Sequence, residues 1–119
     1  MNKTSIIYYQ DRNDNIPFKE FLNKLNNKQK AKILRIFYYI EEYGLIGILP
    51  HTKKLIGYPL WEIRILGNDN IRIIYIIPMK NNVLILHGFI KKKQKTPSKE
   101  IQISLFRYND WIKRFKLDK

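Results

Sequence analysis

The sequence predicts one α+β domain, residues 1–119, in which a small, mainly antiparallel twisted sheet has its helices packed on one face. Three observations predict this class. The 119 residues are 45% hydrophobic, which suits one domain with its own core. Two apolar stripes of helical period come early in the chain. Three strand-like runs joined by short turns follow, before a last helical stripe. The predicted order is therefore β-α-α-β-β-β-α, without an internal repeat.

The first half of the chain predicts a strand and two helices. Ser5 to Gln10 form the strand, and the polar residues 11–15 form the turn that ends it. The first helix begins at Pro17 with Asn15 as its cap, and the second follows Asn26 and ends at Gly44. The apolar positions of the two helices recur every three to four residues: Phe18, Phe21, Leu22 and Leu25, then Ile33, Ile36, Phe37, Ile40 and Tyr43.

The second half predicts a meander and a last helix. Residues 60–66, 71–77 and 83–90 are rich in β-branched and aromatic side chains, and the turns between them are short enough for antiparallel hairpins. The last helix begins at Thr96-Pro97. Its apolar stripe consists of Ile101, Leu105, Tyr108, Ile112 and Phe115. We expect Trp61 to anchor the core beneath the helices, together with Ile63, Ile65, Ile73 and Tyr75.

The charge balance indicates a polyanionic partner. There are 23 Lys and Arg against 10 Asp and Glu, a formal net charge of +13, which favours a nucleic acid, an anionic membrane or an acidic protein. No apolar run approaches the ~20 residues of a membrane-spanning helix, so we expect a cytoplasmic protein without a membrane partner. The absence of cysteine and the presence of only two histidines argue against a disulfide framework, a thiolate site and a structural zinc. We expect no metal and no cofactor.

Two arginines stand inside otherwise apolar strands. If Gly67 to Asp69 form a three-residue loop, Arg64 lies directly opposite Arg72, with Cβ atoms about 5 Å apart. Two guanidinium groups at that separation repel each other unless an anion lies between them, and phosphate fits the planar arginine fork. Glu62 falls on the same face. The alternative is a structural Arg-Glu-Arg salt-bridge network.

Two further features have both a functional and a structural interpretation. The segment from Lys91 to Lys99 holds five lysines and no acid, and it is either an RNA-binding surface or a solvated loop. His87, in the last strand, is either a hydrogen-bonded core residue or a catalytic group.

Five short motifs in this order resemble the RelE/HigB superfamily of bacterial toxins, in particular its phage-derived HigB-like branch. They are Lys54-Leu55, the run from Leu60 to Arg64, the run from Arg72 to Tyr75, the run from Leu86 to Lys92, and the run from Gln94 to Pro97. The resemblance implies a type II toxin that cleaves mRNA on the ribosome and inhibits translation. On this resemblance the toxin is expected to be a metal-independent endoribonuclease, in which the ribose 2′-OH attacks the scissile phosphate. It also implies a cognate antitoxin, of the helix-turn-helix, HigA-like kind, as the partner besides ribosome and mRNA.

The resemblance matches functional residues of the family to single positions of this sequence. Arg72 matches the family's phosphate-stabilising arginine, Arg64 stands where relatives have a strand lysine, and Lys92 where they have a second arginine. Because a guanidinium is a poor base at neutral pH, Arg64 is expected to stabilise charge, and Glu62 is expected to be the base. The general acid of several relatives has no clear match, and His87 and Lys91 are its substitutes. Lysines expected to bind RNA or the ribosome are Lys53, Lys54, Lys91, Lys93 and Lys95.

Two other functions stay open at this level. A ParE-like member of the same fold would poison DNA gyrase without cutting RNA, and the missing general acid favours that alternative. A non-catalytic basic nucleic-acid-binding protein would present a recognition helix rich in Arg, Asn or Gln. The last helix carries Gln102, Arg107 and Asn109, but they are scattered along it.

Overall fold

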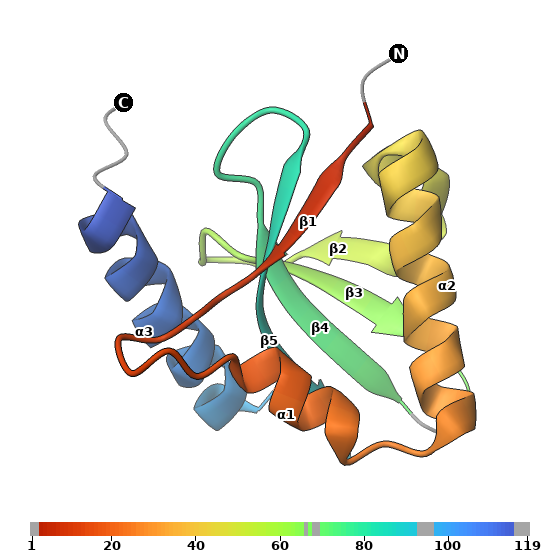
Figure 1. Cartoon of the computed structure of the whole chain (residues 1–119), viewed down its shortest axis with the longest axis horizontal. Helices are drawn as coiled ribbons and strands as arrows, with labels where there is room; N and C mark the ends of the chain where they lie inside the picture. Colours follow the sequence, from red (N-terminus) through yellow and green to blue (C-terminus); the bar gives the residue numbers. More distant parts are fainter. Residues whose placement is uncertain (1–2, 66, 68–69, 93–96, 116–119) are drawn as a thin grey trace.

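The structure is a computed structural model of the 119-residue chain and describes residues 3–65, 67, 70–92 and 97–115. Within these ranges a five-stranded sheet is combined with three α-helices and a 3₁₀ segment (Figure 1). Their order is β1 (Ser5–Tyr8), α1 (Pro17–Asn23), α2 (Asn27–Tyr43), η1 (Leu45–His51), β2 (Thr52–Lys54), β3 (Trp61–Ile65), β4 (Ile71–Ile76), β5 (Asn82–Ile90) and α3 (Ser98–Phe115).

The sheet is mainly antiparallel, as predicted. Its strand order is β1-β5-β4-β3-β2, and β1 pairs in parallel with β5 while all other neighbours are antiparallel. The meander of β3, β4 and β5 is confirmed. The sequence did not predict η1, and it did not predict the edge strand β2, whose three residues are too few to show a period.

The ends of α2 follow the sequence signals. The Asn26 side chain accepts a hydrogen bond from the Gln29 backbone N–H, and the Gln29 side chain accepts one from the Asn26 backbone N–H, which is a complete capping box. Gly44 ends the helix with φ of 75°, a conformation in which glycine pays no steric cost. In α1, Pro17 is the first residue as predicted, but Ile16 takes the cap position that was expected for Asn15.

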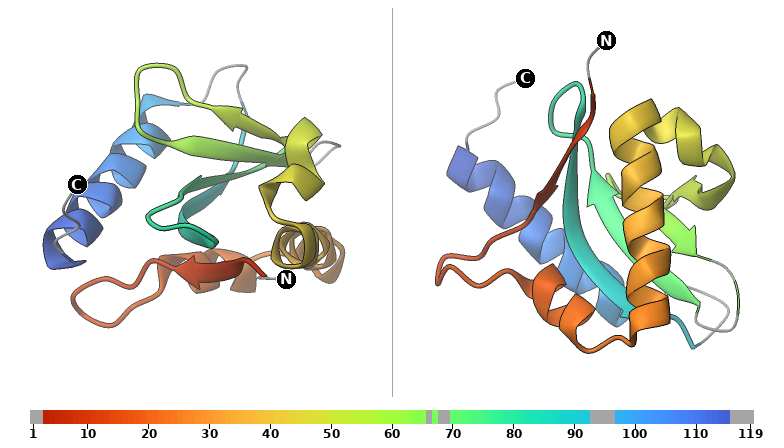
Figure 2. Two further views of the ribbon diagram at one scale, coloured as in Figure 1. Left: turned by 90° about the horizontal axis from the view of Figure 1, so that it is seen from above. Right: turned by 45° about the vertical axis from the view of Figure 1, so that its right-hand side comes forward.

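The prediction that all helices pack on one face of the sheet is wrong. Helices α1 and α2 cover one face, whereas α3 covers the other, as the two views of Figure 2 show. The reason lies in β4 and β5. Ile73 and Ile85 point into the core under α1 and α2, and their chain neighbours Ile74 and Leu84 point into a second core under α3. Strands that are apolar on both sides need a cover on both sides.

Three aromatic side chains differ from expectation. Trp61 is only partly buried at the edge of the first core, so it is not the main anchor. Tyr43 and Phe115 were assigned to apolar stripes, but they are exposed. Trp111 takes the buried position in the second core, where it packs with the partly buried Ile101, Leu105, Tyr108 and Ile112.

A polar clasp holds the C-terminal half of α3 against the segment that follows β1. The Asp110 carboxylate accepts hydrogen bonds from the Tyr9 hydroxyl at 2.6 Å, from Arg12 Nε at 2.8 Å and from Arg114 Nη1 at 2.8 Å. Burial and the Asp110 hydrogen bond raise the pKa of Tyr9 to about 12, and these hydrogen bonds hold the pKa of Asp110 well below its usual range. The clasp fixes the position of α3, which carries groups that contact β5.

Candidate functional site

The strand pair β3–β4 places the two arginines as the sequence predicts. Arg64 is the direct cross-strand partner of Arg72. Their neighbours Ile63, Ile65 and Ile73 point to the opposite side, into the core under α1 and α2. The arginines therefore belong to the face on which α3 packs, away from α1 and α2.

Two more cations join them. Lys53 on β2 is the cross-strand partner of Glu62. Lys91 directly follows β5, where its backbone N–H donates to the Asn70 carbonyl at 2.9 Å and continues the strand pairing. Its side chain is close enough to Arg72, Arg64, Glu62 and Lys53 for all four to act on its pKa. We call the group Lys53, Glu62, Arg64, Arg72 and Lys91 the cationic face.

Arg72 is the most constrained member of this face. Its side chain is only 5% exposed, and its Nη1 donates to the Ile71 carbonyl at 3.2 Å. Its Nε is buried without a hydrogen-bond partner among the described residues and lies 4.0 Å from Glu62 Oε1. Burial lowers the pKa of Arg72, and Arg64 lowers it further, while Glu62 acts in the opposite sense.

This geometry corrects one expectation and limits another. With all helices expected on one face of the sheet, Arg72 and Glu62 on the other face were expected to be exposed. Both are buried, because they lie in the middle strands with Phe89 paired beside Arg72. In the alternative Arg-Glu-Arg network, the contact between Arg72 and Glu62 is 4.0 Å long, which is the outer limit for an ion pair. Such a contact leaves the charge of Arg72 poorly compensated.

Lys91 is the member of the face best suited to give up a proton. Burial lowers its pKa, and the neighbouring charges of Arg72, Arg64 and Lys53 lower it further, against the opposing effect of Glu62. A cation held among other cations releases its proton more readily than an ordinary lysine. A lowered pKa is the direction of change that favours proton donation by a lysine.

His87 lies on the same side of the sheet but is bound on both ring nitrogens. Its Nε2 is 2.6 Å from Glu100 Oε1, and its Nδ1 is 3.1 Å from Arg107 Nη1. A guanidinium can only donate, so Nδ1 accepts, and the neutral ring carries its proton on Nε2 and donates it to Glu100. Burial lowers the pKa of His87 and favours this neutral form.

A β-bulge turns His87 toward α3. The pairing shifts between Ile74, which faces His87, and Tyr75, which faces Ile85, so Leu86 has no direct partner on β4. Arg107 Nη1 also donates to the Leu86 carbonyl at 2.9 Å. Glu100, His87 and Arg107 therefore hold the bulge, which gives His87 a structural part in addition to any chemical one.

The remaining predicted lysines are spread out. Lys92 is exposed beside Lys91, just beyond β5. Lys54 is exposed on β2, and its Nζ donates to the Tyr58 carbonyl at 2.6 Å. Lys93 and Lys95 lie outside the described residues.

The sequence did not reveal the contacts of Glu100 and Arg107 with His87, and Arg107 was considered only as part of a nucleic-acid recognition helix. Their spacing of about two helical turns places them on one side of α3, and that signal was available. What was missing was the knowledge that α3 crosses the sheet beside His87. Within the described ranges, His, Asp and Glu side chains do not form a group of three or more that could hold a metal ion.

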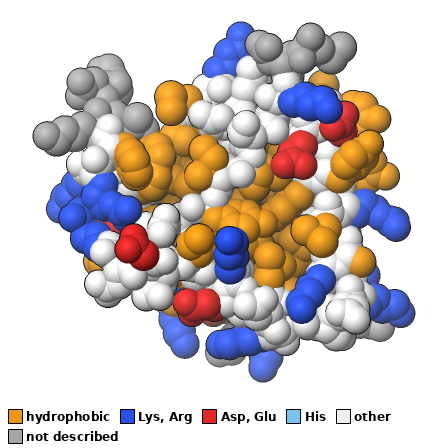
Figure 3. Space-filling model, viewed as in Figure 1, with side chains coloured by type: hydrophobic (Ala, Val, Ile, Leu, Met, Phe, Trp, Pro, Cys, Tyr) orange, Lys and Arg blue, Asp and Glu red, His pale blue; other side chains and the backbone are white. Residues whose placement is uncertain are grey.

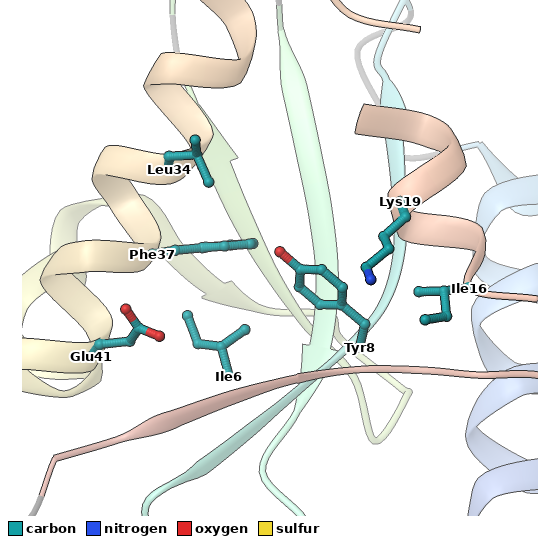
Figure 4. A pocket seen from close by; sticks show the side chains of 7 residues that line it. All are labelled: Ile6, Tyr8, Ile16, Lys19, Leu34, Phe37 and Glu41. Atoms are coloured by element: carbon teal, nitrogen blue, oxygen red, sulfur yellow. The ribbon is translucent and has the colours of Figure 1, made fainter. Parts of the chain in front are cut away.

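The hollow shown in Figure 4 is separate from the cationic face. It measures about 360 Å³ and is lined by Ile6, Tyr8, Ile16, Lys19, Leu34, Phe37 and Glu41. Lys19 from α1 and Glu41 from α2 lie on opposite sides of Tyr8 (Figure 4). Ile6, Tyr8 and Phe37 pack against the first core, so this hollow belongs to the opposite layer of the molecule.

Fold and site together define a small α+β protein that gathers four cations and one carboxylate on a sheet face. The chain belongs to the family described as phage derived protein Gp49-like (DUF891), whose model matches residues 20–109. This is a toxin-type family related to the RelE/HigB toxins, and it implies an antitoxin partner. No curated protein matches the chain. Among the described residues, no helix has the length and apolarity needed to cross a membrane.

Proposed function

We propose that this protein is a HigB-like toxin that cuts mRNA on the ribosome without a metal ion, and that the cationic face holds the scissile phosphate. One observation carries the proposal. Arg64 stands directly opposite Arg72, and Lys91 is close to both. Like charges held this close are relieved by an anion, and arginine forks match the geometry of phosphate oxygens.

The proposed reaction is an internal transfer within the RNA. The ribose 2′-oxygen bonds to the adjacent phosphorus, the bond from phosphorus to the 5′-oxygen breaks, and the products are a 2′,3′-cyclic phosphate and a 5′-hydroxyl. Glu62 takes the 2′-OH proton, and Lys91 gives a proton to the leaving 5′-oxygen. Arg64, Arg72 and Lys92 stabilise the charge that develops on the phosphate oxygens.

Two features of the structure support this division of roles. The lowered pKa of Lys91 favours release of its proton to the leaving oxygen. His87 is already hydrogen-bonded to Glu100 and Arg107, so in this proposal it supports the bulge and does not deliver the proton. Because so small a protein offers few groups to position a long substrate, the ribosome is proposed to align the mRNA.

The test is induced expression of the wild-type chain in bacteria, with primer extension on abundant mRNAs. We expect growth arrest and cuts in register with codons, which disappear from a reporter whose start codon is removed. Lys91→Gln should strongly reduce cutting. Lys80→Gln, an equal loss of charge at the exposed turn at the far end of the β4–β5 hairpin, should leave it unchanged.

Three results would refute the proposal in different ways. Arrest with intact mRNA and broken DNA would identify a gyrase poison. RNA binding without arrest would leave a basic binding protein. Equal activity of Lys91→Gln and Lys80→Gln would remove Lys91 from the reaction while leaving the cleavage itself in place.

A further inference from the structure

Strand β5 does not alternate regularly between the two layers of the molecule. Leu86 packs in the second core, under α3, and the next residue, His87, also contacts α3. In a regular strand, consecutive side chains point to opposite faces. The β-bulge at this point lets both residues share one face, and alternation resumes afterwards with Gly88 against Phe18 and Phe21 of α1.

This bulge decides which lysine reaches the cationic face. Ile90 packs against the first core, under α1 and α2, so Lys91 points to the opposite side, where Arg72 lies. Without the extra residue, every side chain after the bulge would change face. Lys91 would then point toward the layer of α1 and α2, and Lys92 would take its place on the cationic face. The position of Lys91 therefore depends on an irregularity that begins at Leu86.

Helix α3 holds the bulge with hydrogen bonds from two side chains. Arg107 Nη1 donates to the Leu86 carbonyl at 2.9 Å and to His87 Nδ1 at 3.1 Å. On the other side of the ring, His87 Nε2 donates to Glu100 Oε1 at 2.6 Å. Leu86 is fully buried and lacks a direct partner on β4, so an unpaired carbonyl at this position would be costly. Helix α3 therefore stabilises the bulge.

Helix α1 excludes the other register from the opposite layer. A Cβ atom at Gly88 would lie 2.6 Å from Phe21 Cδ2 and 2.7 Å from Phe18 Cε1, so only glycine fits here. A slip by one residue would bring Phe89 under α1 and drive its ring into these two side chains. The register that remains contains the bulge, which the two α3 side chains hold.

We propose that Arg107 and Glu100 are positioning residues for the proposed RNA cleavage: they hold the bulge that places Lys91 on the cationic face. The inference rests on the proposed function, in which Lys91 is the proton donor. Both residues act through β5, since their common partner His87 is four residues and about 13 Å of strand away from Lys91. A misplacement of about 1 Å caused by a distant group can slow a reaction roughly 100-fold.

A second connection to the cationic face passes through Phe89. Its ring stacks on that of His87, with 5.5 Å between the centroids and 23° between the planes. Phe89 is also buried, and it is the direct cross-strand partner of Arg72. A displacement of His87 would therefore disturb the side chain beside Arg72, so the bulge positions the buried arginine as well as the proposed proton donor.

Arg107 differs from the exposed cations of α3. Figure 3 shows Lys and Arg side chains (blue) gathered at the surface over the C-terminal end of α3, at the left-hand edge of the view, and Lys113 is one of the exposed residues of this end. Arg107 is half-buried, and burial lowers its pKa. Its guanidinium lies over the Tyr9 ring at 5.9 Å, and both of its described hydrogen bonds go to the bulge. Lys113 therefore provides a matched control for the loss of one α3 cation.

The position of Lys91 can be measured without RNA, by NMR titration of its side-chain Cε signal in the full-length chain. In the wild type we expect a pKa below the ~10.4 of an ordinary lysine, because burial and the neighbouring cations lower it. Glu100→Met should raise that pKa, since Lys91 moves away from the cations. Loss of the Glu100 charge alone would lower it, so the direction of the change reports displacement.

Glu100→Gln is the conservative comparison. The neutral His87 ring donates from Nε2, and an amide oxygen accepts that hydrogen bond as a carboxylate does. We therefore expect Glu100→Gln to keep the low pKa of Lys91, and the control Lys113→Met to keep it too. Arg107→Met removes both hydrogen bonds to the bulge and should raise the pKa of Lys91 as Glu100→Met does.

The rate of mRNA cutting on purified ribosomes is the second readout. We expect Arg107→Met and Glu100→Met to cut roughly 10- to 100-fold more slowly than the wild type. Glu100→Gln and Lys113→Met should cut at the wild-type rate. A wild type that does not cut RNA would refute the proposed function, while the titration of Lys91 would still test what α3 does to its position.

Three results would overturn the positioning role. Full cutting by Arg107→Met and Glu100→Met, with an unchanged pKa of Lys91, would show that the bulge does not place the lysine. Equal losses in Glu100→Gln and Glu100→Met would show that the carboxylate charge matters and the hydrogen bond does not. A lower free energy of unfolding in urea, with an unchanged pKa of Lys91, would leave both residues a structural part only. If Arg107→Met does not fold, the two Glu100 variants still decide.

Discussion

Replacing Arg72 by methionine tests whether this arginine serves to bind phosphate or to stabilise the fold. The side chain is 5% exposed, its Nε lacks a hydrogen-bond partner among the described residues, and its counter-charge Glu62 is 4.0 Å away. At that distance and an effective dielectric constant near 20, the attraction is about 4 kcal/mol. Burial and the repulsion from Arg64 outweigh it, since the pKa of Arg72 is lowered on balance. The surroundings therefore disfavour the charge.

Methionine reproduces the aliphatic part of the arginine side chain and carries no charge. Replacing a whole buried ion pair by apolar groups is often neutral or stabilising by about 1–4 kcal/mol, whereas removing one partner is costly when the other is left uncompensated. Here Glu62 remains, but it keeps Lys53 opposite it and Lys91 nearby. We expect Arg72→Met to raise the free energy of unfolding by about 1 kcal/mol, which is about 4 °C in Tm for a domain of this size. The same variant should lose growth inhibition.

Urea denaturation and an induced-growth assay on the same variant check both expectations. Lys24→Met, which removes an exposed charge beyond α1, is the control and should change neither. A loss of 3 kcal/mol or more would show that Arg72 is an essential structural partner of Glu62, as breaking a buried ion pair predicts. A stable Arg72→Met variant that still arrests growth would refute the phosphate-binding role.

Two further predictions concern β5. A Cβ atom at Gly88 would lie 2.6 Å from Phe21 Cδ2 and 2.7 Å from Phe18 Cε1. Gly88→Ala should therefore lower the free energy of unfolding, measured by urea denaturation, by about 1–3 kcal/mol. A loss below about 0.5 kcal/mol would mean that α1 can move away from β5 at little cost. For His87, the folded-state pKa lies below the unfolded value of 6.5, so its stabilising effect is complete above that pH and is lost as pH falls through the folded pKa. The groups around it are Glu100, Arg107 and Lys99. The free energy of unfolding should therefore fall between pH 7.5 and pH 5.5 in the wild type, and it should fall less steeply in His87→Gln. Equal pH dependence in the two proteins would contradict the assignment of a neutral His87 ring in the folded state.

Much of the local structure could be predicted because short patterns encode it. The capping box at Asn26 and Gln29 needs only residues three apart. The pairing of Arg64 with Arg72 follows from the length of one turn and the two-residue period of strands. Lys53 and Lys91 were expected to bind RNA from charge alone, and their place beside the arginines emerged only with the sheet.

One long-range feature was visible in the sequence but was interpreted incompletely. The run from Ile71 to Ile76 is apolar at nearly every position, and every residue in it is buried. A strand with one exposed face alternates, so a continuous apolar run indicates burial on both faces. That pattern contradicts helices on a single face and could have placed α3 on the far side.

What the sequence determined by itself is the order of its main elements, the meander, the two opposed arginines and the strong positive charge. Each of these depends on neighbours in the chain or on simple composition. The tertiary structure decided the parallel addition of β1 to β5, the depth at which Arg72 and Glu62 are buried, and the partners of His87. These features depend on contacts between segments that are far apart in the chain. Hydrophobic packing stabilises such contacts, but it leaves no local periodicity in the sequence.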